Sequence, residues 1–130
     1  MGAPAAVTGD QVTGICPVHL IPNPATGVPQ PAPPLPFAAP ITLGVCQTVL
    51  INGSPAVVVS AMGYNTPPHV GLHPADPFFV PLLQQAVITQ GSSSVLFGGV
   101  SAARTGSSAT CCDLPVGTLT GSAATVLIGG

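Results

Sequence analysis

The chain has 130 residues, enough for one domain with a modest core, and only 3% of them are charged, with a net charge of −2. A single arginine cannot neutralise a phosphate backbone, and 4% aromatic residues give few stacking platforms, so the composition excludes nucleic-acid binding. The 17 prolines and 16 glycines interrupt every apolar stretch before it reaches the length of a membrane-spanning helix.

We expect one domain over residues 1–130. So few charges indicate a surface that is covered by a partner or that tolerates apolar surroundings. The first residues have neither a basic region nor an unbroken apolar segment, which predicts synthesis in the cytoplasm without a signal peptide.

The first half of the chain alternates short β-favouring segments with long loops. Residues 1–14 predict a strand and a turn. Residues 16–40 are rich in proline, which excludes a helix and disfavours a central strand, so we expect an extended loop strapped over a β core. Residues 42–60 predict a hairpin that turns at Asn52-Gly53, a pair that readily adopts positive φ.

The second half predicts a similar succession. Residues 61–77 read as a loop, and 78–89 as a returning strand with one helical turn at most. A second hairpin is expected over 93–105 with its turn at Gly98-Gly99, followed by a loop over 106–117 and final strands over 118–129.

Two short patterns recur along the chain. A β-favouring apolar triplet that ends on glycine occurs at 48–53, 94–99 and 125–130, and a small-residue pattern occurs at 4–7, 55–58 and 101–104. The chain therefore begins with the back half of a repeat and ends with the front half. If the two ends pair as neighbouring strands, three hairpins close a ring, which predicts an all-β, pseudo-threefold repeat with long Pro-rich loops.

The candidate metal ligands lie in the three predicted loops, which should gather at one end of the ring. His69 and His73 are three residues apart, and His19 and Cys111 from the other two loops complete a set of four ligands. Imidazole and thiolate ligands in a tetrahedral site are typical of zinc, with iron as the alternative. Such a metal would supply much of the folding free energy of the small end of the ring where the three loops gather.

The cysteines leave alternatives open. Without a secretion signal the four cysteines are expected to be ligands or buried thiols rather than disulfides. Cys16 precedes His19 by three positions and can replace or join it, and Cys112 can take the place of Cys111. Cys46 is expected in the core, and Asp10 in a turn rather than paired with Arg104.

Catalysis has little support in the sequence. No nucleophile–histidine–acid arrangement stands out, and the chain has no glutamate to serve as the base of a zinc hydrolase. We therefore expect a protein that is not an enzyme.

The repeats resemble those of the PAAR-repeat family, the spike-tip proteins of contractile injection systems such as type VI secretion and phage-tail-like extracellular injectors. The likeness is carried by Pro-Ala-Ala-Val at 4–7, Pro-Ala-Val-Val at 55–58 and Ser-Ala-Ala-Arg at 101–104, with their glycine-terminated triplets. It spans nearly the whole chain. It implies a short conical β structure whose pointed end holds zinc through three histidines and one cysteine, here His19, His69, His73 and Cys111.

The chain departs from the family pattern in three places. The first ligand follows Gly9-Asp10 at an unusual distance, only one repeat keeps its arginine, and the Pro-rich segment 22–40 is longer than the minimal pattern.

The resemblance also implies partners. The wide base would dock, one copy per spike, on the blunt end of a trimeric VgrG-type spike that can also carry effectors. The tip would contact a membrane only transiently as it helps to pierce the target envelope, and firing would deliver it outside or into the target cell. The competing hypotheses are a small zinc-dependent hydrolase or toxin, and a coat or adhesion β-protein without metal.

Overall fold

The protein is all-β in a computed structural model that describes residues 2–69, 71–80, 83–112 and 114–129. No helix of these residues is long and apolar enough to cross a membrane. The strands of this part of the chain are β1 (Ala3–Ala5), β2 (Gln11–Cys16), β3 (Leu20–Pro22), β4 (Pro29–Pro31), β5 (Leu35–Pro40), β6 (Cys46–Ile51), β7 (Ser54–Ala56), β8 (Met62–Tyr64), β9 (Gln85–Val87), β10 (Leu96–Phe97), β11 (Val100–Ser101), β12 (Ser108–Cys111), β13 (Leu114–Thr120) and β14 (Ala123–Ile128).

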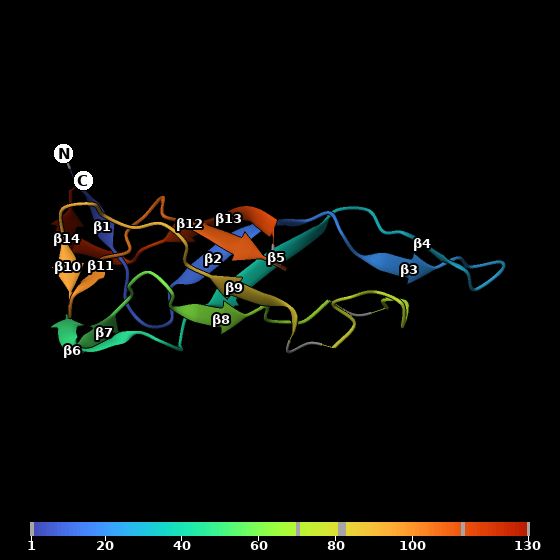
Figure 1. The fold of residues 1–130 in the computed structure, drawn as a ribbon, viewed down its shortest axis with the longest axis horizontal. Coiled ribbons are helices and arrows are strands. Elements are labelled where there is room, and N and C mark those ends of the chain that lie inside the picture. Colours follow the sequence, from blue (N-terminus) through green and yellow to red (C-terminus); the bar gives the residue numbers. More distant parts are fainter. Residues whose placement is uncertain (1, 70, 81–82, 113, 130) are drawn as a thin grey trace.

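The molecule is elongated, and its strands fall into three zones along the long axis (Figure 1). One end, which we call the base, holds the pairs β1/β14, β6/β7 and β10/β11 together with both chain ends. The middle holds the antiparallel sheet β12-β13-β2-β5 and the pair β8/β9. The far end is the hairpin β3/β4, and part of the segment between β8 and β9 runs beside β3.

The two ends of the chain pair with each other, as the split repeat predicts. β1 runs antiparallel to β14, with Ala3 opposite Ile128 and Pro4 opposite Leu127. The hairpin turn at Asn52-Gly53 is also confirmed, with φ values of 53° and 83° that suit a two-residue turn between twisted strands. The third pair, β10/β11, turns at Gly98-Gly99 as expected.

Isolated β-bridges link the small-residue segments that follow β1, β7 and β11. They join Ala5 to Arg104, Val7 to Ala56, and Val58 to Ala102. Each of these segments lies against the other two, and their alanines are buried without exposed surface: Ala5, Ala6, Ala56, Ala102 and Ala103. Small side chains are needed here because the three backbones approach one another closely.

Backbone hydrogen bonds from the residues that directly follow the three small-residue segments connect the same segments again. The N–H groups of Thr8, Val59 and Thr105 donate to the carbonyl oxygens of Pro55, Ser101 and Pro4 respectively, at 2.9, 3.0 and 2.9 Å. The next residues in line, Gly9, Ser60 and Gly106, have φ of 96°, 77° and 92°.

Their N–H groups donate to the carbonyl oxygens of three buried residues that follow the loops, Ile41, Ile88 and Leu119. Asp10 lies in the first of these turns, where its Oδ2 accepts the N–H of Val7 at 2.8 Å, and this confirms its turn role.

The Pro-rich segment differs from the expected strap over the core. Residues 20–31 form the projecting hairpin β3/β4, and 35–40 form β5, the edge strand beside β2. An edge strand tolerates proline because only one of its sides must supply N–H groups to the sheet. The segments 61–77 and 106–117, expected as loops, likewise contain β8, β12 and the start of β13, while β9 begins only at Gln85.

The core has two parts. The larger one lies under the four-stranded sheet and includes Val12, Phe37, Ile41, Ile88 and Leu119. A smaller cluster at the base contains Ile51 and Ile128 with four alanines, Ala5, Ala56, Ala102 and Ala123. The larger core includes Cys16, Cys111 and Cys112, and His19 directly precedes β3.

Candidate metal centre

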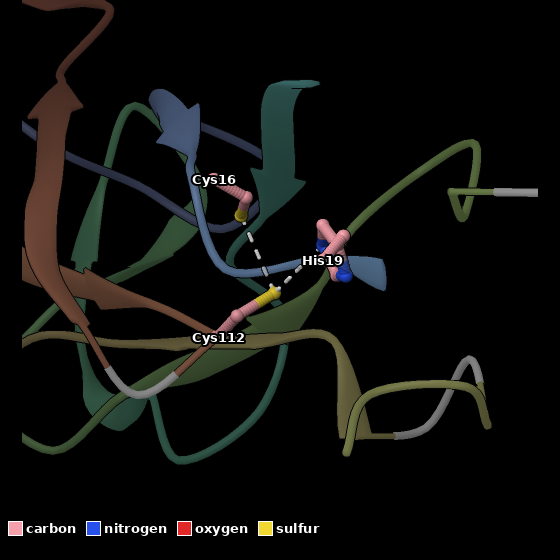
Figure 2. A group of neighbouring side chains, drawn as sticks. All are labelled: Cys16, His19 and Cys112. Atoms are coloured by element: carbon pink, nitrogen blue, oxygen red, sulfur yellow. Dashed lines mark hydrogen bonds between the residues drawn. The ribbon is translucent and has the colours of Figure 1, made fainter. Parts of the chain in front are cut away.

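Side chains from three distant segments meet where the sheet gives way to the projecting hairpin. Cys16 ends β2, His19 lies just before β3, and Cys112 lies in the turn that follows β12. Figure 2 shows the Cys112 sulfur between the Cys16 sulfur and the His19 ring. Because the loops of the repeats converge at this end, residues almost a hundred positions apart become neighbours.

The spacing of these atoms suits a metal ion. Cys16 Sγ lies 3.3 Å from Cys112 Sγ, and Cys112 Sγ lies 3.7 Å from His19 Nε2. Around tetrahedral zinc, bond lengths of about 2.3 Å to sulfur and 2.0 Å to nitrogen place two sulfurs about 3.8 Å apart and a sulfur and a nitrogen about 3.5 Å apart. The two sulfurs would therefore separate by about 0.5 Å on binding, and the sulfur–nitrogen distance is already close to the required one. Among the described residues these three form a group whose ligand atoms lie within 4.8 Å of one another, and this group can hold a metal ion.

His69 lies beside His19, but it is not a member of this group of three, whose ligand atoms all lie within 4.8 Å of one another. Its Nδ1 lies 2.8 Å from His19 Nε2, and the two rings meet edge to face with centroids 4.6 Å apart. Its Nε2 lies 2.6 Å from the carbonyl oxygen of Pro36. A carbonyl oxygen only accepts hydrogen bonds, so His69 carries its proton on Nε2 and turns the Nδ1 lone pair inward.

The protons of His19 are placed in the same way. His19 Nδ1 donates to the buried carboxylate oxygen Oδ2 of Asp76 at 3.0 Å. The 2.8 Å contact between His19 Nε2 and His69 Nδ1 is a hydrogen bond that needs one proton, and a metal ion bound by His19 would replace that proton. A carboxylate and a backbone carbonyl that orient two histidines are typical of the groups that surround bound metal.

The two thiols of the cluster are hydrogen-bonded to each other, with 3.3 Å between Cys16 Sγ and Cys112 Sγ. This hydrogen bond lowers the pKa of the Cys16 thiol. The same bond and burial raise the pKa of Cys112. A divalent cation would displace the thiol protons and be neutralised by two thiolates, which removes the cost of burying a net charge.

The structure brings together two of the four residues singled out from the sequence, His19 and His69. His73 lies on the neighbouring loop, where its Nδ1 accepts the N–H of Ala75 at 3.0 Å and its own N–H donates to Leu20. Cys111 turns the other way, and its Sγ lies 3.2 and 2.8 Å from where a Cβ on Gly14 or Gly117 would stand. Burial raises the pKa of Cys111 to about 12.

The end of β12 distinguishes Cys112 from Cys111. Along β12 the buried side chains alternate, so Cys111 shares the core face with Ala109 and the next residue leaves the strand. Cys112 then takes a positive φ of 49°, and its sulfur lies toward His19. Asp76 had no signal in the sequence, because its role depends only on contacts across the fold.

No protein-family model matches the chain, and a comparison with curated proteins finds no relative. The case for a function therefore depends on the metal centre and on the architecture of the base.

Proposed function

We propose that this chain is a metal-stapled tip that caps the trimeric central spike of a contractile injection system and helps to pierce the target envelope. The role is structural rather than catalytic. The observation that carries the proposal is the cyclic set of backbone hydrogen bonds, Thr8 to Pro55, Val59 to Ser101 and Thr105 to Pro4.

This cycle supports a pseudo-threefold arrangement. Each donor directly follows one copy of the small-residue pattern and each acceptor is the first residue of the next copy, and the third copy returns to the first. The bridges Ala5–Arg104, Val7–Ala56 and Val58–Ala102 follow the same order. A single chain with near-threefold symmetry fits the end of a threefold spike and can cover the open strand edges there.

The base offers three matching contact points for such a spike. Leu50, Leu96 and Leu127 are the middle residues of the three apolar triplets, and their exposed fractions are 59%, 59% and 62%. They stand opposite Pro55, Ser101 and Pro4, which are equivalent positions of the repeats. Exposed leucines at three equivalent places suit three identical subunits of a partner.

Zinc is the metal that we propose for the cluster. Two thiolates and two imidazoles in tetrahedral geometry are a ligand set of structural zinc, with iron as the alternative. The proposed ligands are Cys16, His19 and Cys112, and we propose His69, which contacts His19, as the fourth after its ring turns toward the ion. A fourth protein ligand would leave no position for a substrate or an activated water, as in a structural rather than a hydrolytic zinc site.

The test measures metal content and assembly together. Purified protein should contain about one zinc per chain by elemental analysis, and native mass spectrometry should show one chain per spike trimer. Cys16→Ser and Cys112→Ser should each lose the metal and lower the melting temperature, whereas Cys111→Ser, a matched thiol outside the cluster, should keep the metal. Metal-free protein of unchanged heat stability, or a complex with three chains per trimer, would contradict the proposal.

A further inference from the structure

The hairpin β3/β4 is the part of the molecule farthest from the base (Figure 1). Its strands pair antiparallel, with Leu20 opposite Pro31, Ile21 opposite Gln30, and Pro22 opposite Pro29. It is joined to the body beside the metal centre, where the N–H of Ala32 donates to the carbonyl oxygen of His19. We call residues 19–32 the distal hairpin.

The prolines of the distal hairpin take the positions that need no N–H. The pairs Asn23–Val28 and His19–Ala32 are hydrogen-bonded, with Asn23 N to Val28 O at 2.8 Å and Ala32 N to His19 O at 2.9 Å. Hydrogen-bonded and non-hydrogen-bonded pairs alternate along an antiparallel ladder. The register therefore puts Pro22, Pro29 and Pro31 at non-hydrogen-bonded positions, and Ile21 opposite Gln30 at a bonded one.

Other backbone donors of the distal hairpin also find acceptors inside the protein. Leu20 N donates to Asp76 Oδ2, and Gly27 N to the carbonyl oxygen of Asn23. The turn donors are served by side chains, with Ala25 and Thr26 bonded to Asn23 Oδ1 and Val28 to Thr26 Oγ1. The amide of Asn23 itself donates to Gln30 Oε1 at 3.0 Å.

The surface of this element carries no formal charge. Apart from the buried His19, residues 19–34 contain no acidic, basic or histidine side chain. Val28 lies at the end of the turn with 58% of its surface exposed, although water-exposed hairpin turns are usually polar. Backbone N–H groups with acceptors inside the protein and a surface without charge lower the cost of entering the headgroup region of a bilayer, where unpaired polar groups cost less than in the hydrocarbon core.

We propose that the distal hairpin enters the surface of an electrically neutral lipid bilayer and is the first element of the protein to do so. The inference rests on the proposed function, because it assigns the lipid contact of a spike tip to one element. Neutral lipid is the matching surface because the hairpin has no cation to attract anionic headgroups and the whole chain has a net charge of −2.

The test uses the absence of tryptophan from the chain, so that a single introduced indole reports its own surroundings. Val28→Trp places it in the distal hairpin, and Leu96→Trp places it at the base on an equally exposed apolar position, 58% against 59%. With phosphatidylcholine vesicles, Val28→Trp emission should shift to shorter wavelength and be quenched by brominated lipid, while Leu96→Trp emission stays unchanged.

A second pair of variants tests the role of charge without any probe. Val28→Lys should weaken vesicle binding roughly tenfold or more in a flotation assay, whereas Leu96→Lys should leave it unchanged. Adding anionic phosphatidylglycerol should not strengthen binding by the parent chain.

Three results would overturn the inference: no spectral shift at Val28→Trp, an equal shift at Leu96→Trp, or binding that requires anionic lipid. Zinc content and spike binding are measured on the same Val28→Trp sample. If the sample contains zinc and binds the spike but its emission does not shift with lipid, only the proposed lipid contact of the distal hairpin is refuted. If its emission shifts with lipid but it contains no zinc, only the proposed metal-stapled tip is refuted.

Discussion

Asp76 organises the outer side of the metal centre at the scale of a single residue. Its Oδ2 accepts hydrogen bonds from His19 Nδ1 at 3.0 Å and from Leu20 N at 2.6 Å, and its Oδ1 accepts the N–H of Phe78 at 2.6 Å. The residue is only 4% exposed, so these donors replace the water that a carboxylate needs. One side chain therefore fixes the His19 tautomer and ties β3 to the loop that follows residue 73.

Asp76→Asn should weaken metal binding. The amide keeps an acceptor for the backbone but no longer carries the charge that supports His19, and loss of such an outer partner typically costs about 10- to 100-fold in metal affinity. Competition with a zinc chelator measures the change. Asp10→Asn is the matched control, since Asp10 Oδ2 accepts only the backbone N–H groups of Val7 and Ser122. Equal losses in both variants would contradict the role of Asp76.

The thiols of the chain should differ in reactivity. The hydroxyl of Thr48, 3.3 Å from Cys46 Sγ, lowers the pKa of Cys46, whereas burial raises the pKa of Cys111. The thiolate is the nucleophile, so the rate of alkylation by iodoacetamide should rise at lower pH for Cys46 than for an ordinary thiol.

Thr48→Val should move the pH midpoint of Cys46 alkylation upward, and Thr48→Ser should leave it in place. Peptide mapping by mass spectrometry follows each cysteine. Equal midpoints in the valine and serine variants would show that the hydroxyl has no part in the reactivity of Cys46.

The sequence predicted a metal centre of histidine and cysteine ligands, but it did not identify every residue of that centre. His19 and His69 could be chosen because histidines are few and lie in converging loops. Between Cys111 and Cys112, however, the sequence offers two identical side chains, and the choice depends on where β12 ends. Asp76 could not be chosen at all, because the preference of a histidine for one tautomer arises from a contact between distant segments.

At the scale of elements, the turns after the three small-residue segments share one backbone conformation. Gly9, Ser60 and Gly106 all have positive φ, and a side chain in this region costs about 1 to 2 kcal/mol. Two of the turns avoid this cost with glycine, and the middle one does not.

Ser60→Gly should therefore stabilise the protein by about 1 kcal/mol, and Gly106→Ala should destabilise it by about the same amount. A Cβ on Gly106 would have no neighbour within 4 Å, so the expected loss reflects the backbone conformation alone. Denaturant unfolding gives both values. A stabilising Gly106→Ala variant would show that the turns are not equivalent.

Strand prediction failed where prolines are common, and β5 shows why. Pro36, Ala38 and Pro40 alternate along this strand and turn their backbone nitrogens away from β2. Only Ala38 has an N–H on that outer side, and it donates to Asn65 Oδ1. Prolines thus fit an edge strand when they fall at every second position, a condition that composition does not reveal. The glycine turns, in contrast, carry their conformation in the residue itself and were predictable.

At the scale of the whole molecule, the base combines exposed leucines with a core that does not depend on them. Leu50, Leu96 and Leu127 point away from the small cluster formed by Ile51, Ile128 and four alanines. Substitutions of these leucines should therefore reduce binding to the partner without changing the stability of the fold.

The triple variant Leu50→Ser, Leu96→Ser and Leu127→Ser should lose binding to the trimeric spike. Its free energy of unfolding should change by about 0.5 kcal/mol or less per substitution, as is usual for exposed positions. Ile15→Ser is the control, because Ile15 is 56% exposed on β2, outside the base strands. A pull-down assay measures binding to the spike, and unfolding in urea measures the change in the free energy of unfolding. Retained spike binding in the triple variant would place the docking surface elsewhere.

The position of the metal centre along the long axis has a mechanical consequence. The distal hairpin is a slender beam fixed at one end, and a sideways load on its free turn produces the largest bending moment at the root. That root is His19 and Ala32, joined by a backbone hydrogen bond and flanked by Cys16, Cys112 and His69. A metal ion coordinated at this point would stiffen the root, where the bending moment is largest. Loss of the ion would let the distal hairpin bend about its root.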